Sequence, residues 1–247
     1  MMLIRSLAFN AFSLLTMIFF ALFGLLTAPL PFHFRYRFFS QWARINLWWL
    51  RVTCGIRYEV QGAENIPEGG GILLCKHQST WETLALQQIF PPQVWVLKKQ
   101  LLFLPFFGWG LALLEPIAIN RSSRKKAMTQ IIEQGRQRLA DGRWVVIFPE
   151  GTRIPAGTRG HYKLGGARLA EATQAPTLAM VHNAGEHWPK RKLLKRPGVI
   201  HVRISAPIAT AGRSVNEINQ AVETWIEDQM LEICSPENRA RLAQQRP

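Results

Sequence analysis

A histidine and a glutamate five positions apart are the first residues of this chain that could carry chemistry. They are His77 and Glu82, in the stretch Lys-His-Gln-Ser-Thr-Trp-Glu that covers residues 76–82. A neutral imidazole accepts a proton at physiological pH, and a hydrogen-bonded carboxylate orients the ring and stabilises the imidazolium that forms. The pair therefore predicts a general base that removes a proton from a nucleophile such as a hydroxyl.

A second set of residues lies in the turn Phe148-Pro149-Glu150-Gly151-Thr152-Arg153. Glycine permits a tight turn, and the backbone amides around it can face an anion. The guanidinium of Arg153 can bind a phosphate through two parallel hydrogen bonds. This turn predicts a site for an anionic substrate, and the two sets together supply the two halves of one reaction.

Glu82 also has a structural interpretation. Ser79-Thr80-Trp81-Glu82 fits the capping box, in which a glutamate accepts a hydrogen bond from the backbone amide at the start of its helix. The two roles are compatible because a carboxylate has several acceptor sites. Lys76 has two interpretations as well: its side chain points to the opposite face of its strand, or it lies near His77 and disfavours protonation of the imidazole.

The first sixty residues predict attachment to a membrane. No Asp, Glu, Lys or Arg occurs from Ser6 to Phe34, and Leu7 to Ala28 is almost entirely apolar. About twenty such residues in a helix span a hydrocarbon core of roughly 30 Å, whereas the apolar region of a signal peptide is usually shorter. The following segment, Phe38 to Val52, interleaves arginines with tryptophans, as in a helix at the lipid head-group boundary. The alternative is a buried helical hairpin in a soluble protein.

Composition narrows the function classes. The chain has 247 residues, long enough for one α/β domain and an appendage, and its formal net charge of +14 predicts attraction to anionic lipid, acidic carriers or nucleic acid. Because the basic charge accompanies an apolar segment of spanning length, membrane lipid is expected and nucleic acid is not. Three widely spaced cysteines fit neither a disulfide framework nor a zinc site, so no metal is expected.

The remainder alternates short apolar strands with helices, which predicts an α/β fold with a largely parallel sheet flanked by helices. The expected strands are 71–75, 94–97, 117–120, 144–148, 177–181 and 199–205. The expected helices are 80–89, 123–140, 164–173 and 215–233, the last with a capping box at Ser214 and Glu217. The apolar stretch 101–114 is either a buried helical hairpin or a surface for acyl chains or membrane. The tail 235–247 is polar and expected to be loosely ordered.

These motifs, in this order, resemble those of the glycerolipid acyltransferases, specifically the bacterial 1-acylglycerol-3-phosphate acyltransferases. Two further blocks of the family match residues 115–121 and 175–181, and Phe148–Arg153 matches letter for letter. The family's H-x4-D motif appears with glutamate at position 82, and Lys76 stands where asparagine commonly precedes the histidine.

The resemblance implies a general base at His77, an orienting acid at Glu82 and no covalent acyl-enzyme. It also implies a site for the phosphate of the acceptor. Its expected residues are Arg121, Glu150, Gly151, Thr152 and Arg153, with Lys98, Lys99 and Lys163 as auxiliaries. Glu150 is expected to fix the loop rather than to touch the phosphate.

The expected function is transfer of a fatty acyl group to the sn-2 hydroxyl of lysophosphatidic acid. The co-substrate is an acyl-CoA or acyl-carrier-protein thioester, and no cofactor is expected. Residues 1–57 are expected to anchor the chain, 58–234 to form the acyltransferase domain and 235–247 the tail. The expected location is the bacterial inner membrane, with the catalytic domain facing the cytoplasm because arginines follow the first helix. The alternatives are acyl transfer to another lysolipid, such as a lyso-ornithine lipid, and a non-catalytic basic membrane-binding protein.

Overall fold

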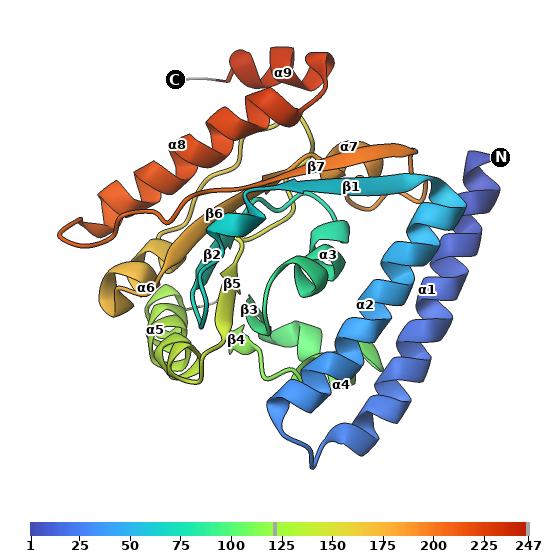
Figure 1. Cartoon of the computed structure of the whole chain (residues 1–247), viewed down its shortest axis with the longest axis horizontal. Helices are drawn as coiled ribbons and strands as arrows, with labels where there is room; N and C mark the ends of the chain where they lie inside the picture. The colour runs from blue at the N-terminus through green and yellow to red at the C-terminus, as the bar shows by residue number, and fades with distance from the viewer. Residues whose placement is uncertain (121–122, 246–247) are drawn as a thin grey trace.

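A seven-stranded sheet forms the centre of the protein in the computed structural model, which describes residues 1–120 and 123–245. The strands lie in the order β1-β7-β6-β2-β5-β3-β4 (Figure 1). Every neighbouring pair is parallel except β6 and β7. The strands are β1 (Ile56–Gln61), β2 (Ile72–Cys75), β3 (Gln93–Lys98), β4 (Ile117–Ile119), β5 (Trp144–Ile147), β6 (Thr177–His182) and β7 (Gly198–Ile204). The prediction of a largely parallel sheet is confirmed.

Helices cover both faces of this sheet and bury two apolar clusters against it (Figure 1). Central strands such as β2 and β5 are buried at every position, as expected of a parallel sheet between two helical layers. The helices are α1 (Met2–Gly24), α2 (Phe32–Cys54), α3 (Trp81–Ile89), α4 (Phe107–Ala112), α5 (Arg124–Ala140), α6 (Gly165–Thr173), α7 (Ala184–His187), α8 (Val215–Ile233) and α9 (Pro236–Ala243). Short 3₁₀ turns occur at Leu25–Thr27, Ala63–Asn65 and Lys99–Phe103.

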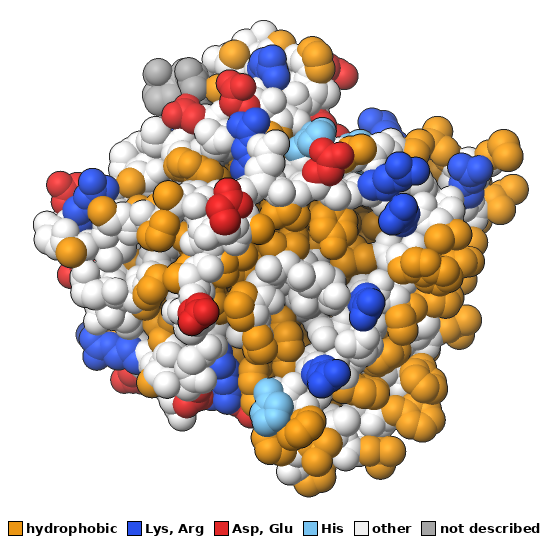
Figure 2. All heavy atoms as spheres, in the orientation of Figure 1, with side chains coloured by type: hydrophobic (Ala, Val, Ile, Leu, Met, Phe, Trp, Pro, Cys, Tyr) orange, Lys and Arg blue, Asp and Glu red, His pale blue; other side chains and the backbone are white. Residues whose placement is uncertain are grey.

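The N-terminal helices α1 and α2 form an antiparallel hairpin along one side of the protein (Figure 1). Gly24 allows the close approach of α2, because a Cβ atom there would lie 2.3 Å from Cζ of Phe39. The outward face of α1 exposes large apolar side chains along its length, among them Leu7, Leu15 and Phe19. Hydrophobic side chains accordingly gather over the hairpin at the right of Figure 2. By length and composition, residues Met2–Thr27 are the one candidate membrane span in the described part of the chain.

The structure differs from the sequence interpretation in one element, corrects one prediction, and decides against one of two alternatives. Strand β1 was not expected, because only Ile56 in it is buried and its apolar pattern is weak. The tail is not loose throughout: Ser235 caps helix α9, whose Leu242 packs into the core. The stretch 101–114 is not a fully buried hairpin, since Phe103 is 73% exposed and Leu104 47%.

The topology places His77, the turn Phe148–Arg153 and Lys98 at one edge of the sheet. Strands β6, β2, β5 and β3 are neighbours and run in the same direction, so their carboxyl ends lie together. His77 follows β2, the turn Phe148–Arg153 follows β5, and Lys98 ends β3. In open parallel sheets this edge is where ligands bind.

Candidate active site

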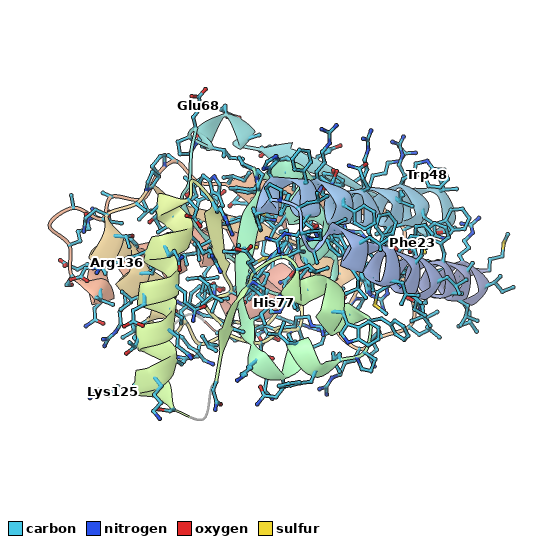
Figure 3. All side chains as sticks on the ribbon, turned by 90° about the horizontal axis from the view of Figure 1, so that it is seen from below. Phe23, Trp48, Glu68, His77, Lys125 and Arg136 are labelled. Atoms are coloured by element: carbon cyan, nitrogen blue, oxygen red, sulfur yellow. The ribbon has the colours of Figure 1, made fainter. Side chains whose placement is uncertain are left out.

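His77 and Glu82 make direct contact. Nδ1 of His77 lies 2.7 Å from Oε1 of Glu82. The imidazole is 17% exposed, whereas the carboxylate is fully buried. Because the carboxylate accepts, Nδ1 carries the proton and Nε2 is left as the basic nitrogen. Figure 3 shows His77 between helix α5, which carries Lys125 and Arg136, and the hairpin that carries Phe23 and Trp48.

The carboxylate of Glu82 is fixed by backbone amides as well as by His77. The amides of Gln78 and Ser79 donate to Oε1 at 3.0 and 2.9 Å. Burial alone would raise the pKa of Glu82, but His182, His77 and the Ser79 amide together hold this pKa below its ordinary value. The carboxylate therefore both closes the turn before α3 and supports His77, so both interpretations of Glu82 are compatible with the geometry.

The expected capping box is only half formed. Glu82 accepts from the Ser79 amide, but Ser79 Oγ accepts from the amide of Trp81 at 3.2 Å rather than from that of Glu82. The helix begins at Trp81, with Thr80 at the N-cap and no side-chain cap. Ser79 Oγ instead donates to the carbonyl of Trp188 at 2.7 Å.

The turn after β5 holds His77 from three sides. Oε2 of Glu150 accepts from the backbone amide of His77 at 2.8 Å. The amide of Ile154 donates to the carbonyl of His77 at 2.7 Å. The ring of Phe148 stacks on the imidazole with centroids 4.0 Å apart and an angle of 18° between planes. The two motifs therefore form one unit, in which the second fixes the backbone and ring plane of the first.

Lys76 points away from His77 into a buried ionic cluster. Its ammonium lies 2.8 Å from Oε1 of Glu150 and 2.6 Å from Oε1 of Glu227 in helix α8. The hydroxyl of Tyr162 donates to the same Glu227 oxygen at 2.7 Å. Desolvation lowers the pKa of Lys76, but the two carboxylates outweigh it and the net shift is upward. Lys76 is thus a buried cation that positions Glu150, and the alternative in which it lies near His77 is wrong.

A second histidine, which the sequence did not suggest, lies on the far side of Glu82. His182 ends β6 and is fully buried, with Nε2 3.7 Å from Oε2 of Glu82. Nε2 donates to the carbonyl of Lys76 at 2.9 Å, and Nδ1 accepts from the amide of Ala184 at 3.3 Å. Burial lowers the pKa of His182 and the Glu82 carboxylate raises it, with a net shift downward. The available signal was a histidine at the end of a predicted strand, without a second motif to mark it.

The candidate anion-binding residues gather beside His77 only in part. Nη1 of Arg153 donates to Oγ1 of Thr80 at 2.8 Å, which places the guanidinium at the start of α3. Gly151 has φ of +66°, and the Lys163 ammonium lies 2.6 Å from where a Cβ atom of Gly151 would be. Thr152 is exposed.

The other expected cations are less well placed or lie elsewhere. Lys98 and Lys99 are exposed at the end of β3. Arg121 lies outside the described residues. A cation that the sequence reading missed is Lys190, whose ammonium donates to the carbonyl of Arg153 at 2.8 Å and to Oγ1 of Thr152 at 3.3 Å. Its signal was a basic run at 190–196, which belongs to none of the motifs in the sequence.

Comparison with known proteins gives a consistent result. The profile of the Acyltransferase family matches residues 57–183. The chain is 50% identical over 214 residues to a 1-acyl-sn-glycerol-3-phosphate acyltransferase of Pseudomonas aeruginosa, covering 85% of this chain and 83% of that protein. The enzyme of that name from Saccharomyces cerevisiae is 30% identical over 78% of this chain and 65% of its own length.

The fold is also found in a solved structure. The crystal structure of the 1-acyl-sn-glycerophosphate (LPA) acyltransferase PlsC from Thermotoga maritima superposes with a TM-score of 0.79. The superposition covers 94% of this chain and 95% of the Thermotoga chain, and the two are 23% identical in sequence. The α/β sheet with its N-terminal helices is therefore shared with that protein.

Proposed function

This chain belongs to the acyltransferase family, and we propose that His77 and Glu82 are the residues with which it acylates the sn-2 hydroxyl of 1-acylglycerol 3-phosphate. The product is phosphatidic acid, and the second substrate is a fatty acyl thioester of coenzyme A or of acyl carrier protein. The observation that carries the assignment is the 2.7 Å contact between His77 Nδ1 and the buried carboxylate of Glu82.

The proton moves through His77 in both halves of the reaction. The hydroxyl oxygen attacks the thioester carbonyl carbon while Nε2 of His77 takes its proton. The tetrahedral intermediate then collapses, the carbon–sulfur bond breaks, and the departing thiolate takes the proton back from the imidazolium. Glu82 stabilises that imidazolium, because its carboxylate is already fixed by two amides and does not reorganise.

The acceptor phosphate binds at the turn after β5. Arg153 supplies the bidentate contact, and Lys163 and Lys190 add positive charge on either side of the turn. Arg121, Lys98 and Lys99 are assigned to the same anion as outer cations, on the basis of the family resemblance. Glu150 and Lys76 act indirectly, because they hold the backbone of His77 and are buried away from solvent.

The membrane supplies the acceptor, and the hairpin brings the site to it. One face of α1 packs on α2 and α4, while the other exposes apolar residues along its length. Exposed Phe103, Leu104 and Trp109 add a second apolar surface near β3. We assign the hairpin to the inner membrane with the catalytic domain on the cytoplasmic side, where acyl-CoA and acyl carrier protein are available.

Acyl transfer with the purified chain tests this function. Acyl-CoA and acyl-carrier-protein donors are each combined with lysophosphatidic acid, a lysophospholipid without a terminal phosphate and a lyso-ornithine lipid. The proposal expects transfer to lysophosphatidic acid at least tenfold faster than to the other two. Equal transfer to all three acceptors would contradict a phosphomonoester site and support the more general lysolipid acyltransferase.

A further inference from the structure

A basic segment that the reaction does not account for connects α7 to β7. We call it the basic loop: residues 189–197, Pro-Lys-Arg-Lys-Leu-Leu-Lys-Arg-Pro. It contains five cations and no acid, and two adjacent leucines lie at its centre. Leu193 is 45% exposed and Leu194 is 46% exposed. The two leucines therefore form a small, half-exposed apolar patch among cations.

The basic loop is fastened to the start of helix α1. The amide of Lys195 donates to Oγ of Ser6 at 2.9 Å, and its ammonium donates to Oδ1 of Asn10 at 2.7 Å. The same ammonium lies 4.9 Å from the ring centroid of Phe9 and 4.7 Å from that of Trp188. Only 2% of Lys195 is exposed, so this lysine is an anchor and the loop has a defined position on α1.

The other end of the basic loop contacts the turn assigned to the acceptor phosphate. Lys190 donates to the carbonyl of Arg153 and to Oγ1 of Thr152. The loop therefore bridges the N-terminal helix and the anion-binding turn. Anything that binds its outer face is brought next to the site.

The backbone conformation of the basic loop places cations on its solvent-exposed side. The amide of Lys192 donates to the carbonyl of Pro189 at 3.2 Å, which closes a four-residue turn. Arg191 is the third residue of this turn and has φ of +58°, a conformation that favours glycine. An arginine here is conformationally unfavourable but adds an exposed charge. Arg191, Lys192 and Arg196 are all exposed.

We propose that the basic loop is a lipid-contacting surface, in which the cations bind anionic head groups and the two leucines enter the head-group boundary. This inference rests on the proposed membrane function. Charge complementarity is the first argument, because each Lys or Arg near an anionic bilayer adds attraction. Continuity is the second: the first turns of α1, to which the loop is fastened, expose Met2, Ile4 and Leu7. An acidic carrier protein would use the charges, but it does not explain leucines adjoining an apolar helix.

A fluorescent reporter at position 194 tests the contact directly. Leu194→Cys in the full-length chain is labelled with an environment-sensitive dye, since the three native cysteines are buried. The matched control is Asn216→Cys, at the exposed start of α8 and at the opposite end of the molecule (Figure 1). The protein is reconstituted into phosphatidylcholine vesicles with or without phosphatidylglycerol. Helix α1 retains the chain on both kinds of vesicle, so the dye reports on the loop alone.

The proposal expects a several-fold rise in emission at position 194 on vesicles that contain phosphatidylglycerol, and none at position 216. Arg191→Gln/Lys192→Gln should reduce this rise in emission at position 194 several-fold, whereas Lys125→Gln/Lys126→Gln on α5 should leave it unchanged. A dye at 194 that stays in water on both vesicles would overturn the proposal. A dye at position 194 that responds to soluble acyl carrier protein but not to vesicles would also overturn the proposal.

An activity measurement separates this inference from the function on which it rests. Leu193→Gln/Leu194→Gln should raise the KM for lysophosphatidic acid presented in anionic vesicles and leave the KM for a short-chain, water-soluble acceptor unchanged. If the unaltered chain acylates neither acceptor, the proposed function fails while the dye still reports on the loop. If the variant behaves like the unaltered chain in vesicles, the function stands and the loop proposal fails.

Discussion

The carboxylate of Glu150 accepts a hydrogen bond from the backbone amide of His77, 73 positions earlier in the chain. This contact joins the two motifs at their backbone, and the Lys76 ammonium holds the other oxygen of Glu150. The position of the proposed base therefore depends on a residue that does not face the substrate.

Removal of Glu150 should damage both stability and catalysis. Glu150→Ala leaves the buried ammonium of Lys76 with one carboxylate and the His77 amide without its acceptor, so the free energy of unfolding should fall by about 3 kcal/mol or more. Glu150→Gln keeps an acceptor for the amide. Desolvation raises the pKa of Glu150 despite the nearby Lys76, so the neutral side chain should be tolerated better. Chemical denaturation and kcat of both variants check this, and equal losses would show that the amide contact does not matter.

The contributions of Lys76 and Glu227 to the free energy of unfolding should depend on each other. Lys76→Met alone leaves two buried carboxylates without their cation, whereas Lys76→Met/Glu227→Gln removes one charge of each sign. We expect the double variant to be more stable than the sum of the single effects by about 1–3 kcal/mol. Denaturation of the four proteins in the cycle measures this, and additive effects would show that the 2.6 Å contact carries no coupling.

Substitutions of Glu82 should separate the effect of its charge from the effect of its hydrogen bonds. Glu82→Gln retains one acceptor oxygen for the backbone amides but cannot stabilise the imidazolium, so kcat should fall by a factor of roughly 10² to 10⁴. Its amide nitrogen also faces the Ser79 amide, which lies 3.1 Å from Oε2 of Glu82, so a loss of about 1–2 kcal/mol of stability is expected. Glu82→Asp keeps the charge and should retain substantial activity. A stable glutamine variant with most of its kcat would remove Glu82 from the catalytic residues.

The carboxylate of Glu82 should also change how the free energy of unfolding depends on pH in the acid range. Its pKa is depressed from 4.5 in the folded state, so its contribution to stability is complete above pH 4.5 and is lost as the pH falls through the depressed value. The stability difference between the unaltered chain and Glu82→Gln should therefore shrink as the pH falls below 4.5. Urea titrations at a series of pH values in this range measure it. A difference that stays the same or grows as the pH falls below 4.5 would show that the folded state does not favour the ionised carboxylate.

Arg153 should govern recognition of the acceptor. Arg153→Ala should raise the KM for lysophosphatidic acid at least tenfold and change the donor KM little, while Arg153→Lys should recover only part of the loss because an ammonium cannot form the bidentate contact. Arg159→Ala is the matched control, since its guanidinium pairs with Glu223 instead. Steady-state kinetics with each substrate varied in turn provide the comparison. Equal effects on both KM values would remove Arg153 from the phosphate site.

The local features of the fold were predictable from the sequence because they depend on near neighbours. Short apolar runs marked six of the strands, and Ser214 and Glu217 form the capping box that their spacing predicted. Strand β1 was missed because its side chains are mostly exposed at the edge of the sheet. Helix α9 was missed because a single buried leucine in a polar tail gives no periodic signal.

Contacts between distant residues could not be predicted in the same way. Lys76 pairs with Glu227, 151 positions away, and no local pattern distinguishes that glutamate from others on α8. His182 and Lys190 reach the site through the strand order, in which β6 lies beside β2. Only the fold brings their side chains to Glu82 and to the Arg153 turn.

The central claim is that His77 is the base that activates the acceptor hydroxyl. The most direct measurement is the single-turnover rate of acyl transfer by His77→Gln, with the Kd for lysophosphatidic acid determined in parallel. The proposed mechanism predicts a rate lower by about 10³-fold or more, at the upper end of general-base effects, with the Kd changed less than about threefold because His77 does not hold the phosphate. A His77→Gln variant that transfers the acyl group within tenfold of the unaltered rate would contradict the mechanism.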